Sequence, residues 1–391
     1  MLLNPATAAK SSSLSLVEGL HEERQFCLSS FSYQRGSVRI EWPGGDSVRK
    51  AKYVGALLVV VGILLRPESA VEGAQRAMRL WVSSVAPALF PFLVLMPVLT
   101  GPEACAAYTA LFSRIMQPLF RLPGQAAPAV FIGMISGSPG GAIATARIAG
   151  QSGMQCGQVW RIALAVAGVS PAFLVMGVGQ GLYGSAALGA KLALIQMAVQ
   201  LILLFALRSC FCGETERATL KLEQTQDQPV RQAVEHVLVI CGYMVFFSAL
   251  ACVAASMLGK ESGLALLLLM DLPSGLAELS ACSFSGVSFV LGAAIGFGGL
   301  CIGMQNLDVL SPTGLSLRDY IAVRCMGASL MGVGCMLVLP ESTITLVERV
   351  QNPINACAFS VLIAAVLALP GMVYFSKKYL INRARMTAKT R

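Results

Sequence analysis

The sequence contains few charged residues. Asp, Glu, Lys and Arg make up 13% of its 391 residues, whereas a soluble domain carries about 25%. Hydrophobic residues make up 55%, and the mean hydropathy is +0.70. This composition excludes an ordinary water-soluble domain and indicates that the lipid bilayer is the main partner of the chain.

Histidine is almost absent. The only two histidines are His21, in the N-terminal stretch, and His236, far from it in the sequence. A histidine-based metal site or catalytic triad is therefore not expected. No nucleophile and base pair and no cofactor motif stand out, so the sequence predicts no enzyme, no metal and no cofactor.

The twelve cysteines do not form a ligand pattern. Most of them lie singly inside apolar runs, where a free thiol packs as a small apolar group. The one close pair, Cys210 and Cys212, has a spacing that matches no zinc motif. We therefore expect free cysteines.

The net charge of +9 comes from basic residues at the edges of apolar segments. Arg49, Lys50 and Lys52 precede the first apolar segment, and the tail 377–391 is basic. This distribution is typical of the positive-inside rule rather than of a nucleic-acid surface. Both ends are expected in the cytoplasm, and no nucleic-acid partner is expected.

Apolar stretches recur along the chain at lengths near those that cross a bilayer. Lipid offers the backbone no hydrogen-bond partners, so the spanning element is expected to be the helix. The sequence predicts an all-α polytopic membrane protein with about eight transmembrane helices. The stretches are Tyr53–Leu65, Val82–Thr100, Ala190–Leu207, Val237–Leu258, Phe284–Met304, Tyr320–Leu339 and Ala356–Phe375.

Residues 1–47 differ from the rest because they are polar and rich in serine. They fit a disordered cytoplasmic tail. They equally fit an untranslated leader, with Val48 encoded by a GTG start codon. The remaining organisation is predicted as a first membrane half 48–208, a polar linker 209–232, a second membrane half 233–376 and the basic cytoplasmic tail 377–391.

The two membrane halves resemble diverged copies. Each contains two hydrophobic segments that are interrupted by Gly, Pro, Ser or Asp, and the first half carries an extra stretch, 102–122. Paired interruptions in two halves indicate inverted repeats and a transporter site. The interruptions are Ser136–Gly141 and Gly168–Phe173 in the first half, and Asp271–Gly275 and Gly296–Leu300 in the second.

The first interruption is expected to break a helix near Ser136, because Pro139 lacks a backbone donor and its glycines favour non-helical dihedrals. A new helix near Ala142 would point free N–H groups at an anion such as a carboxylate. The alternative is close helix packing or a simple kink. The candidate substrate-binding residues here are Ser136, Gly137, Ser138, Gly140, Gly141 and, in the next interruption, Ser170.

The second half contributes Asp271, Ser274, Gly275, Gln305 and Asn306 as candidate site residues. A carboxylate such as that of Asp271 near the membrane interior costs at least ~2.5 kcal/mol. It should be paired, protonated or bound to a cation, or else lie at an interface. The two amides supply donors and acceptors without a charge, or cap a helix end.

Three arginines lie in largely apolar segments. Arg324 fits a bidentate carboxylate clamp, but it fits equally well a side chain that snorkels or pairs with Asp308 or Asp319. For Arg147 and Arg161, snorkelling to the headgroups is the favoured interpretation.

Five ordered motifs resemble the YlbJ-type sporulation integral membrane proteins, which are similar to the wider nucleoside-recognition (Gate) domain group. The resemblance covers about 53–375. The motifs are WVSSVAPALFPF from Trp81 to Phe92, Phe120–Gly124, SGSPGGA from Ser136, Ser170–Phe173 and FGGLCIGMQ from Phe297 to Gln305.

The resemblance implies a multipass protein with two Gate-like repeats in an endospore-forming bacterium. It further implies a role at the outer forespore membrane, where dipicolinic acid moves toward the developing spore. The chain departs from the family pattern at Ser138, where a Tyr is usual, at Ile143, where a Lys is usual, and at Asp271, where a Glu is usual. It also lacks the usual Asn-rich approach to the Ser170 turn.

The sequence thus favours a transporter of a small anionic or polar solute that works by alternating access around the two breaks. A coupling cation and a homo-oligomer are compatible with it. The alternatives are a membrane scaffold for spore-envelope assembly and a permease for nucleosides or other solutes.

Overall fold

The computed structural model describes residues 46–211, 218 and 228–339, and only the backbone for 46–52. All of them belong to one compact unit. Within these ranges the chain forms helices and no strand, which confirms the all-α class. The leader before residue 46, most of the linker, the apolar stretch 356–375 and the basic tail lie outside the described residues.

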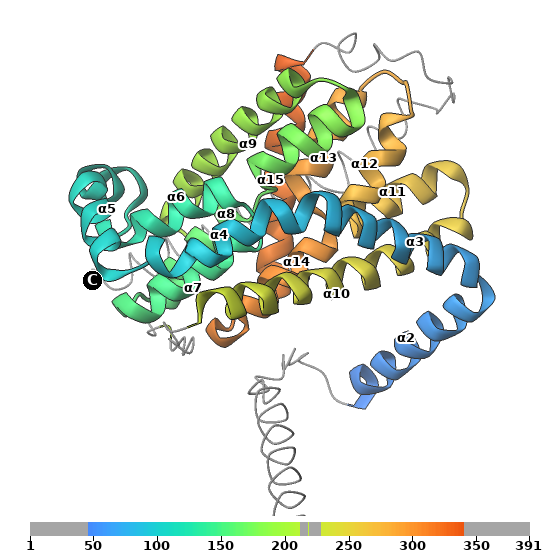
Figure 1. Ribbon diagram of the computed structural model, residues 1–391, viewed down its shortest axis with the longest axis horizontal. Helices are drawn as coiled ribbons and strands as arrows, with labels where there is room; N and C mark the ends of the chain where they lie inside the picture. The colour runs from blue at the N-terminus through green and yellow to red at the C-terminus, as the bar shows by residue number, and fades with distance from the viewer. Residues whose placement is uncertain (1–45, 212–217, 219–227, 340–391) are drawn as a thin grey trace, which may run out of the picture. The chain divides into compact units, whose positions relative to one another are not determined.

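The first half begins with a long helical run and then breaks into shorter pieces (Figure 1). The letter η marks short 3-10 or π-helical segments. Its elements are α2 (Asp46–Leu65), α3 (Pro67–Leu80), η1 (Trp81–Val85), α4 (Ala86–Leu99), α5 (Pro102–Ile115), η2 (Met116–Phe120), η3 (Gly124–Ala126), α6 (Ala127–Ser136), α7 (Gly140–Ser152), α8 (Cys156–Val166), η4 (Phe173–Leu182), α9 (Ala186–Ala206) and η5 (Leu207–Ser209).

The second half also contains long and broken helices. Its elements are α10 (Pro229–Ser256), α11 (Lys260–Met270), α12 (Leu272–Ser280), α13 (Val287–Phe297), α14 (Gly299–Leu310), η6 (Ser311–Thr313) and α15 (Leu317–Val338). The extra stretch that distinguishes the first half is α5 with η2.

Proline and glycine set many of these boundaries. Proline occupies one of the first two positions of α3, α5, α6, α10 and α12, where its missing N–H leaves no bond unmade. Glycine follows the last residue of α6, α7 and α13, where it adopts dihedrals that other residues avoid. These local rules explain why the sequence locates the breaks.

Five helical runs in the described part of the chain are long and apolar enough to cross a bilayer. They overlap five of the seven predicted spans; Tyr53–Leu65 is a shorter apolar helix within α2. The total of about eight crossings stays a prediction. The five runs are Pro67–Leu99, Ala186–Ser209, Pro229–Ser256, Val287–Thr313 and Leu317–Val338.

Burial divides the helices into two groups. Nearly every residue of α8 and α13 and most of α7 are buried, so these short helices form the centre. The long helices expose large apolar side chains, such as Val82, Leu194 and Leu337. An exposed apolar surface of this extent fits contact with lipid. The chain is an integral membrane protein whose most buried helices, α8 and α13, are short.

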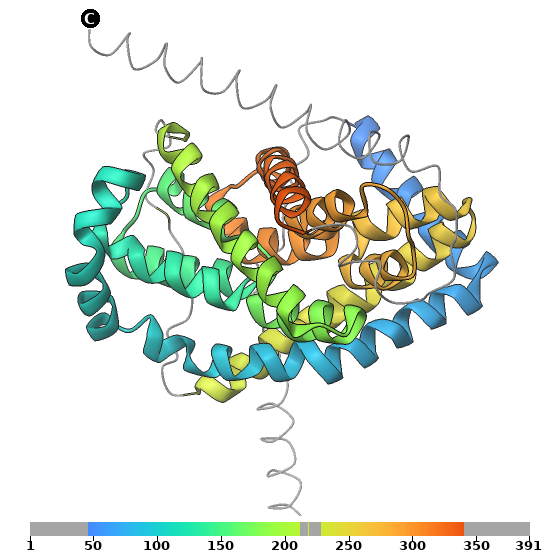
Figure 2. The same cartoon turned by 90° about the horizontal axis from the view of Figure 1, so that it is seen from above.

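Neighbouring elements come from both halves of the chain. The α3 helix packs along α10, and the views in Figures 1 and 2 show the two side by side. The α9 helix also packs against α15 across the two halves, whereas α13 packs along α15, and η4 along α9, within one half. Each half has the order long helix, broken pair, broken pair, long helix. The packing of the two sets is not identical, and their descent from one repeat stays a prediction.

Candidate functional site

One pocket is lined by both predicted breaks. Ser138 and Pro139 come from the break between α6 and α7, and Asp271, Leu272 and Pro273 come from the break between α11 and α12. About 70 Å³ of the pocket is open to the centres of water molecules. Because one water needs roughly 10–15 Å³ by this measure, the pocket has room for several waters, or for a small solute in their place.

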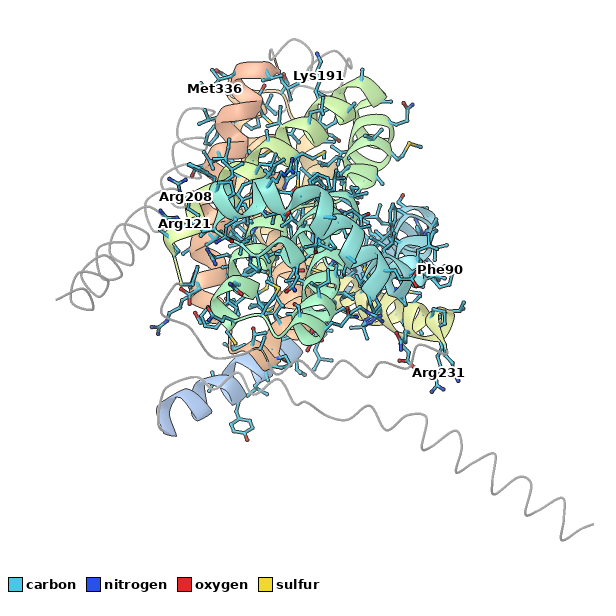
Figure 3. The ribbon with its side chains drawn as sticks, turned by 90° about the vertical axis from the view of Figure 1, so that its left-hand side faces the viewer. Phe90, Arg121, Lys191, Arg208, Arg231 and Met336 are labelled. Carbon is cyan, nitrogen blue, oxygen red and sulfur yellow. The ribbon has the colours of Figure 1, made fainter. Side chains whose placement is uncertain are left out.

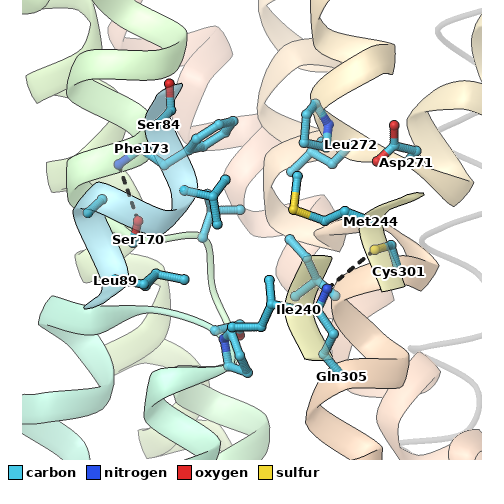
Figure 4. A pocket seen from close by; sticks show the side chains of 17 residues that line it. Ser84, Leu89, Ser170, Phe173, Ile240, Met244, Asp271, Leu272, Cys301 and Gln305 are labelled. Carbon is cyan, nitrogen blue, oxygen red and sulfur yellow. Dashed lines mark hydrogen bonds between the residues drawn. The ribbon is translucent and has the colours of Figure 1, made fainter. Parts of the chain in front are cut away.

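Figure 4 shows how the two halves face each other across this pocket. Ser170 and Leu89 lie on one side, and Asp271, Met244 and Cys301 lie on the other. Most of the lining is apolar. The polar side chains are Ser84, Ser138, Ser170, Asp271 and Gln305, and the lining contains no Lys, Arg or His.

The first break follows the predicted course. The α6 helix ends at Ser136, and α7 begins at Gly140, two residues before the expected start. Gly141 N–H donates to Gly137 O at 2.7 Å, and Ile143 N–H donates to Pro139 O at 3.1 Å. Of the first four N–H groups of α7, at most those of Gly140 and Ala142 therefore remain for a solute.

Two serine hydroxyls at the breaks of the first half can donate into the pocket. The Ser138 oxygen accepts a hydrogen bond from Asn306 Nδ2 at 3.0 Å. The Ser170 oxygen accepts one from the backbone N–H of Phe173 at 3.2 Å. Each oxygen is used as an acceptor in these bonds, so each O–H proton stays available as a donor.

Asn306 joins the two halves of the site. Besides its bond to Ser138, its Nδ2 donates to the Tyr320 hydroxyl at 2.9 Å. Both amide protons are thus used, and the buried Oδ1 atom has no partner. The Asn306 side chain is 1% exposed and lies behind the pocket wall, which makes it a positioning residue rather than a lining residue.

The second break buries a carboxyl group. Asp271 separates α11 from α12, is 2% exposed and faces the pocket. The Ser248 and Ser274 hydroxyl oxygens lie 3.2 Å apart, and both side chains hydrogen-bond the Asp271 carboxyl group. No ion pair to Asp271 occurs among the described residues. Asp271 lies at the end of α11 and is buried within the protein; its protonation, cation binding and depth in the bilayer stay predictions.

Gln305 lies in the pocket wall on α14. Its Nε2 atom is 3.4 Å from the Cys301 sulfur, which is a weak acceptor. The amide is therefore able to exchange this contact for a stronger partner. A helix-end cap is not its role, because Gln305 lies in the interior of α14.

The remaining candidate residues of the two breaks make packing contacts and do not line the pocket. Ser136 donates to Ile132 O in its own helix at 2.8 Å. A Cβ atom on Gly137 would lie 2.4 Å from Ser170 N, one on Gly141 would lie 2.9 Å from Gly133 Cα, and one on Gly275 would lie 2.6 Å from Leu268 N. A Cβ atom on Gly140 would meet the Ser136 hydroxyl at 2.7 Å. These glycines permit close approach, as the packing alternative predicted.

Arg324 lies away from the pocket lining. Its Nε donates to Phe297 O at 3.0 Å, and its Nη2 donates to Gly296 O. The guanidinium therefore caps the C-terminal carbonyls of α13 at the Gly298 break. Among the described residues it pairs with neither Asp308 nor Asp319, and at 1% exposure it does not snorkel.

Snorkelling is also wrong for Arg161, which is 5% exposed. It donates to the backbone carbonyls of Arg208 at 2.9 Å and Arg121 at 3.4 Å. Figure 3 shows these two residues close together. Arg147 donates to Gln232 and is half-buried. All three arginines thus bind backbone or amide oxygens within the protein.

The pocket also contains residues that the sequence interpretation missed. Ser84 and Ala88 come from the η1 and α4 segment, and Ile240 and Met244 come from α10. A polar Ser83-Ser84 pair inside an apolar run marks the first group. Ile240, Met244 and Ser248 are spaced four residues apart and share one face of α10, but only tertiary packing shows that this face meets the pocket.

Comparison with known proteins gives one curated relative. The chain is 24% identical over 330 residues to the sporulation integral membrane protein YlbJ of Bacillus subtilis (strain 168). The alignment covers 72% of this chain and 80% of the relative. No family model matches, and no solved structure matches. The resemblance to YlbJ-type proteins is confirmed, whereas the Gate-domain assignment stays a prediction.

Proposed function

We propose that this chain transports a small anionic or polar solute. The proposal rests on its similarity to the sporulation integral membrane protein YlbJ and on its pocket. The observation that carries the proposal is the shared pocket of Pro139 and Pro273. Broken helices in the membrane interior are tolerated where they line a cavity. Paired breaks that face each other are typical of transporter sites.

Dipicolinic acid, an aromatic dicarboxylate, is the solute we propose, together with a location at the outer forespore membrane. The mostly apolar walls suit a flat ring, and the hydroxyls of Ser138 and Ser170 can donate to a carboxylate. The pocket offers no fixed positive charge. Hydrogen-bond donors and the remaining N–H groups of α7 would bind the anion.

Alternating access is the mechanism that we propose. In it, the two broken pairs would move against each other around the pocket, with the α6–α7 pair on one side and the α11–α12 pair on the other. Asn306 on α14 would act between the first broken pair and the second half, because it contacts Ser138 in the first break and Tyr320 on α15.

Uptake of labelled dipicolinate into proteoliposomes tests the proposal. Ala88 lines the pocket on α4, so Ala88→Leu fills it with a larger apolar group. We expect uptake to fall by about tenfold or more, which corresponds to only about 1.4 kcal/mol of binding free energy. The control is Ala198→Leu, the same change at an exposed position of α9, which should leave uptake unchanged.

Other outcomes would favour the alternative functions. A scaffold for spore-envelope assembly would show no uptake in proteoliposomes, and Ala88→Leu would still support sporulation as well as the unsubstituted chain does. A nucleoside permease would show uptake that excess uridine suppresses and excess dipicolinate does not. Either result would overturn the proposed substrate.

A further inference from the structure

A carboxyl group without a cationic partner forms part of the pocket wall. Asp271 is 2% exposed and has no ion pair among the described residues. An isolated ionised carboxylate in an apolar surrounding is strongly disfavoured. A neutral, protonated carboxyl group avoids this cost, and so does a bound cation.

The surroundings of Asp271 suit a proton. Ser248 on α10 and Ser274 on α12 are both buried, and both side chains hydrogen-bond the carboxyl group. Each serine has one O–H proton, so a serine that donates to the carboxylate cannot also donate to the other serine. A third proton on the carboxyl group would supply the missing donor. The three groups can thus take up one proton without moving apart.

A bound anion gives a second reason for Asp271 to be protonated. Its lining contains no Lys, Arg or His, so an anion that enters meets Asp271 as the charged group of the wall. Two like charges at close range disfavour each other's ionised forms. Protonation of Asp271 removes that repulsion at the moment when the anion binds.

We propose that Asp271 takes up one proton when an anionic solute binds, and that the proton travels with the solute. This inference rests on the proposed transport function. The step is a simple protonation: a proton from water binds the carboxylate on one side of the membrane, and the carboxyl group returns it to water on the other side. No other bond forms or breaks.

The other titratable groups near Asp271 do not substitute for it. Arg76 on α3 acts electrostatically on Asp271, but it pairs with Glu72 at 2.9 Å and Glu278 at 3.4 Å on the partly exposed surface. The thiols of Cys252 on α10 and Cys301 on α14 also face Asp271. Asp271 is the one carboxyl group in the pocket lining.

Binding of dipicolinate to the purified full chain, measured by titration calorimetry from about pH 6 to 8, tests the inference; simple carboxylates are ionised in that range. If one proton accompanies binding, the wild-type Kd rises about tenfold per pH unit once Asp271 is ionised in the free protein. Asp271→Asn replaces the acid by a neutral side chain of similar shape. We expect its Kd to be tight and independent of pH.

The matched control is Asp308→Asn, the same substitution on α14 outside the pocket lining. Its Kd should depend on pH as the wild-type Kd does. Cys252→Ser, also outside the pocket lining, should leave this pH dependence of Kd unchanged as well. Ser248→Ala should shift the pH at which Kd begins to rise. If Ser248 were merely structural, the variant would instead weaken binding equally at every pH.

Proton uptake provides a measurement that does not need a variant. Dipicolinate uptake into proteoliposomes should remove about one proton from the medium per solute, as one titrating group requires. A pH-independent wild-type Kd, or a Kd that depends on Na⁺ instead, would overturn the inference while the transport function stands. If wild type neither binds nor takes up dipicolinate, the proposed substrate fails, and this inference fails with it.

Discussion

Asn306 on α14 donates a hydrogen bond of 3.0 Å to the hydroxyl oxygen of Ser138, at the break between α6 and α7. The same amide group donates to the Tyr320 hydroxyl on α15 at 2.9 Å. One buried side chain thus connects the first break with two helices of the second half. The geometry of the pocket depends on contacts of this kind.

Replacement of Asn306 by Leu should destabilise the protein. The change leaves the part-buried Ser138 oxygen and the buried Tyr320 oxygen without their common donor, and such a loss costs about 1–3 kcal/mol. Thermal unfolding in detergent measures it. Ser329→Ala is the control, because Ser329 bonds only to Cys325 O of its own helix. Equal melting temperatures of the two variants would contradict the bridging role.

Replacement of Gly137 by Ala should be more damaging than the same change at Gly153. Both glycines have a positive φ, 66° and 62°, and therefore both substitutions strain the backbone by about 1 kcal/mol or more. Only at Gly137 would the new Cβ atom also meet Ser170, at 2.4 Å from its nitrogen; nothing lies within 4 Å at Gly153. Gly137 also has a ψ of −165°, a region open almost only to glycine, whereas Gly153 has the milder left-handed ψ of 35°. The two melting temperatures therefore measure the combined cost of this backbone region and the Ser170 contact. Equal losses would show that the contact can relax.

Replacement of Arg324 by Lys tests whether this residue caps α13 or binds solute. A lysine cannot reproduce the fork that reaches both Phe297 O and Gly296 O. We expect a loss of stability of about 1–3 kcal/mol, with the solute affinity of the folded fraction little changed. Arg318→Lys, at an exposed position of the same helix, should behave as wild type. Wild-type stability with a large loss of solute affinity would instead favour the carboxylate clamp.

Replacement of Thr313 by Val should weaken the contact between α8 and η6. The Trp160 indole N–H donates to the Thr313 hydroxyl at 3.0 Å in a buried setting. Valine keeps the shape but removes the acceptor, so the N–H loses its partner at a cost of about 1–3 kcal/mol. Unfolding followed by tryptophan fluorescence measures the change. Thr313→Ser keeps a hydroxyl and should be the milder substitution; the reverse order would rule out the hydrogen bond as the cause.

Local sequence rules predicted the breaks well. The end of α6 at Ser136, the end of α11 at Met270 and the end of α13 at Phe297 follow from Gly, Pro and Asp in otherwise apolar segments. The same rules did not separate lining residues from packing residues. Of the twelve candidates, Ser138, Ser170, Asp271 and Gln305 line the pocket, whereas Gly141 and Gly275 contact neighbouring helices.

Charged residues were the hardest to interpret from the sequence. An arginine in an apolar segment can bind a solute, a headgroup or a backbone carbonyl. The residues around Arg324 do not distinguish these three possibilities. The choice depends on which oxygen lies within reach, and for Arg324 these are the carbonyls of a broken helix from another segment. The sequence likewise did not identify the partners of Asp271, and the structure places two serines beside its carboxyl group.

The sequence by itself determined the membrane class, the helical content and the points at which helices break, because hydropathy and backbone dihedrals are properties of short segments. Only the tertiary structure decided that Pro139 and Pro273 face one pocket, that Ser248 meets Ser274 and that Asn306 reaches Ser138. These contacts join residues that are far apart in the chain. They depend on how whole helices pack, which no local pattern specifies.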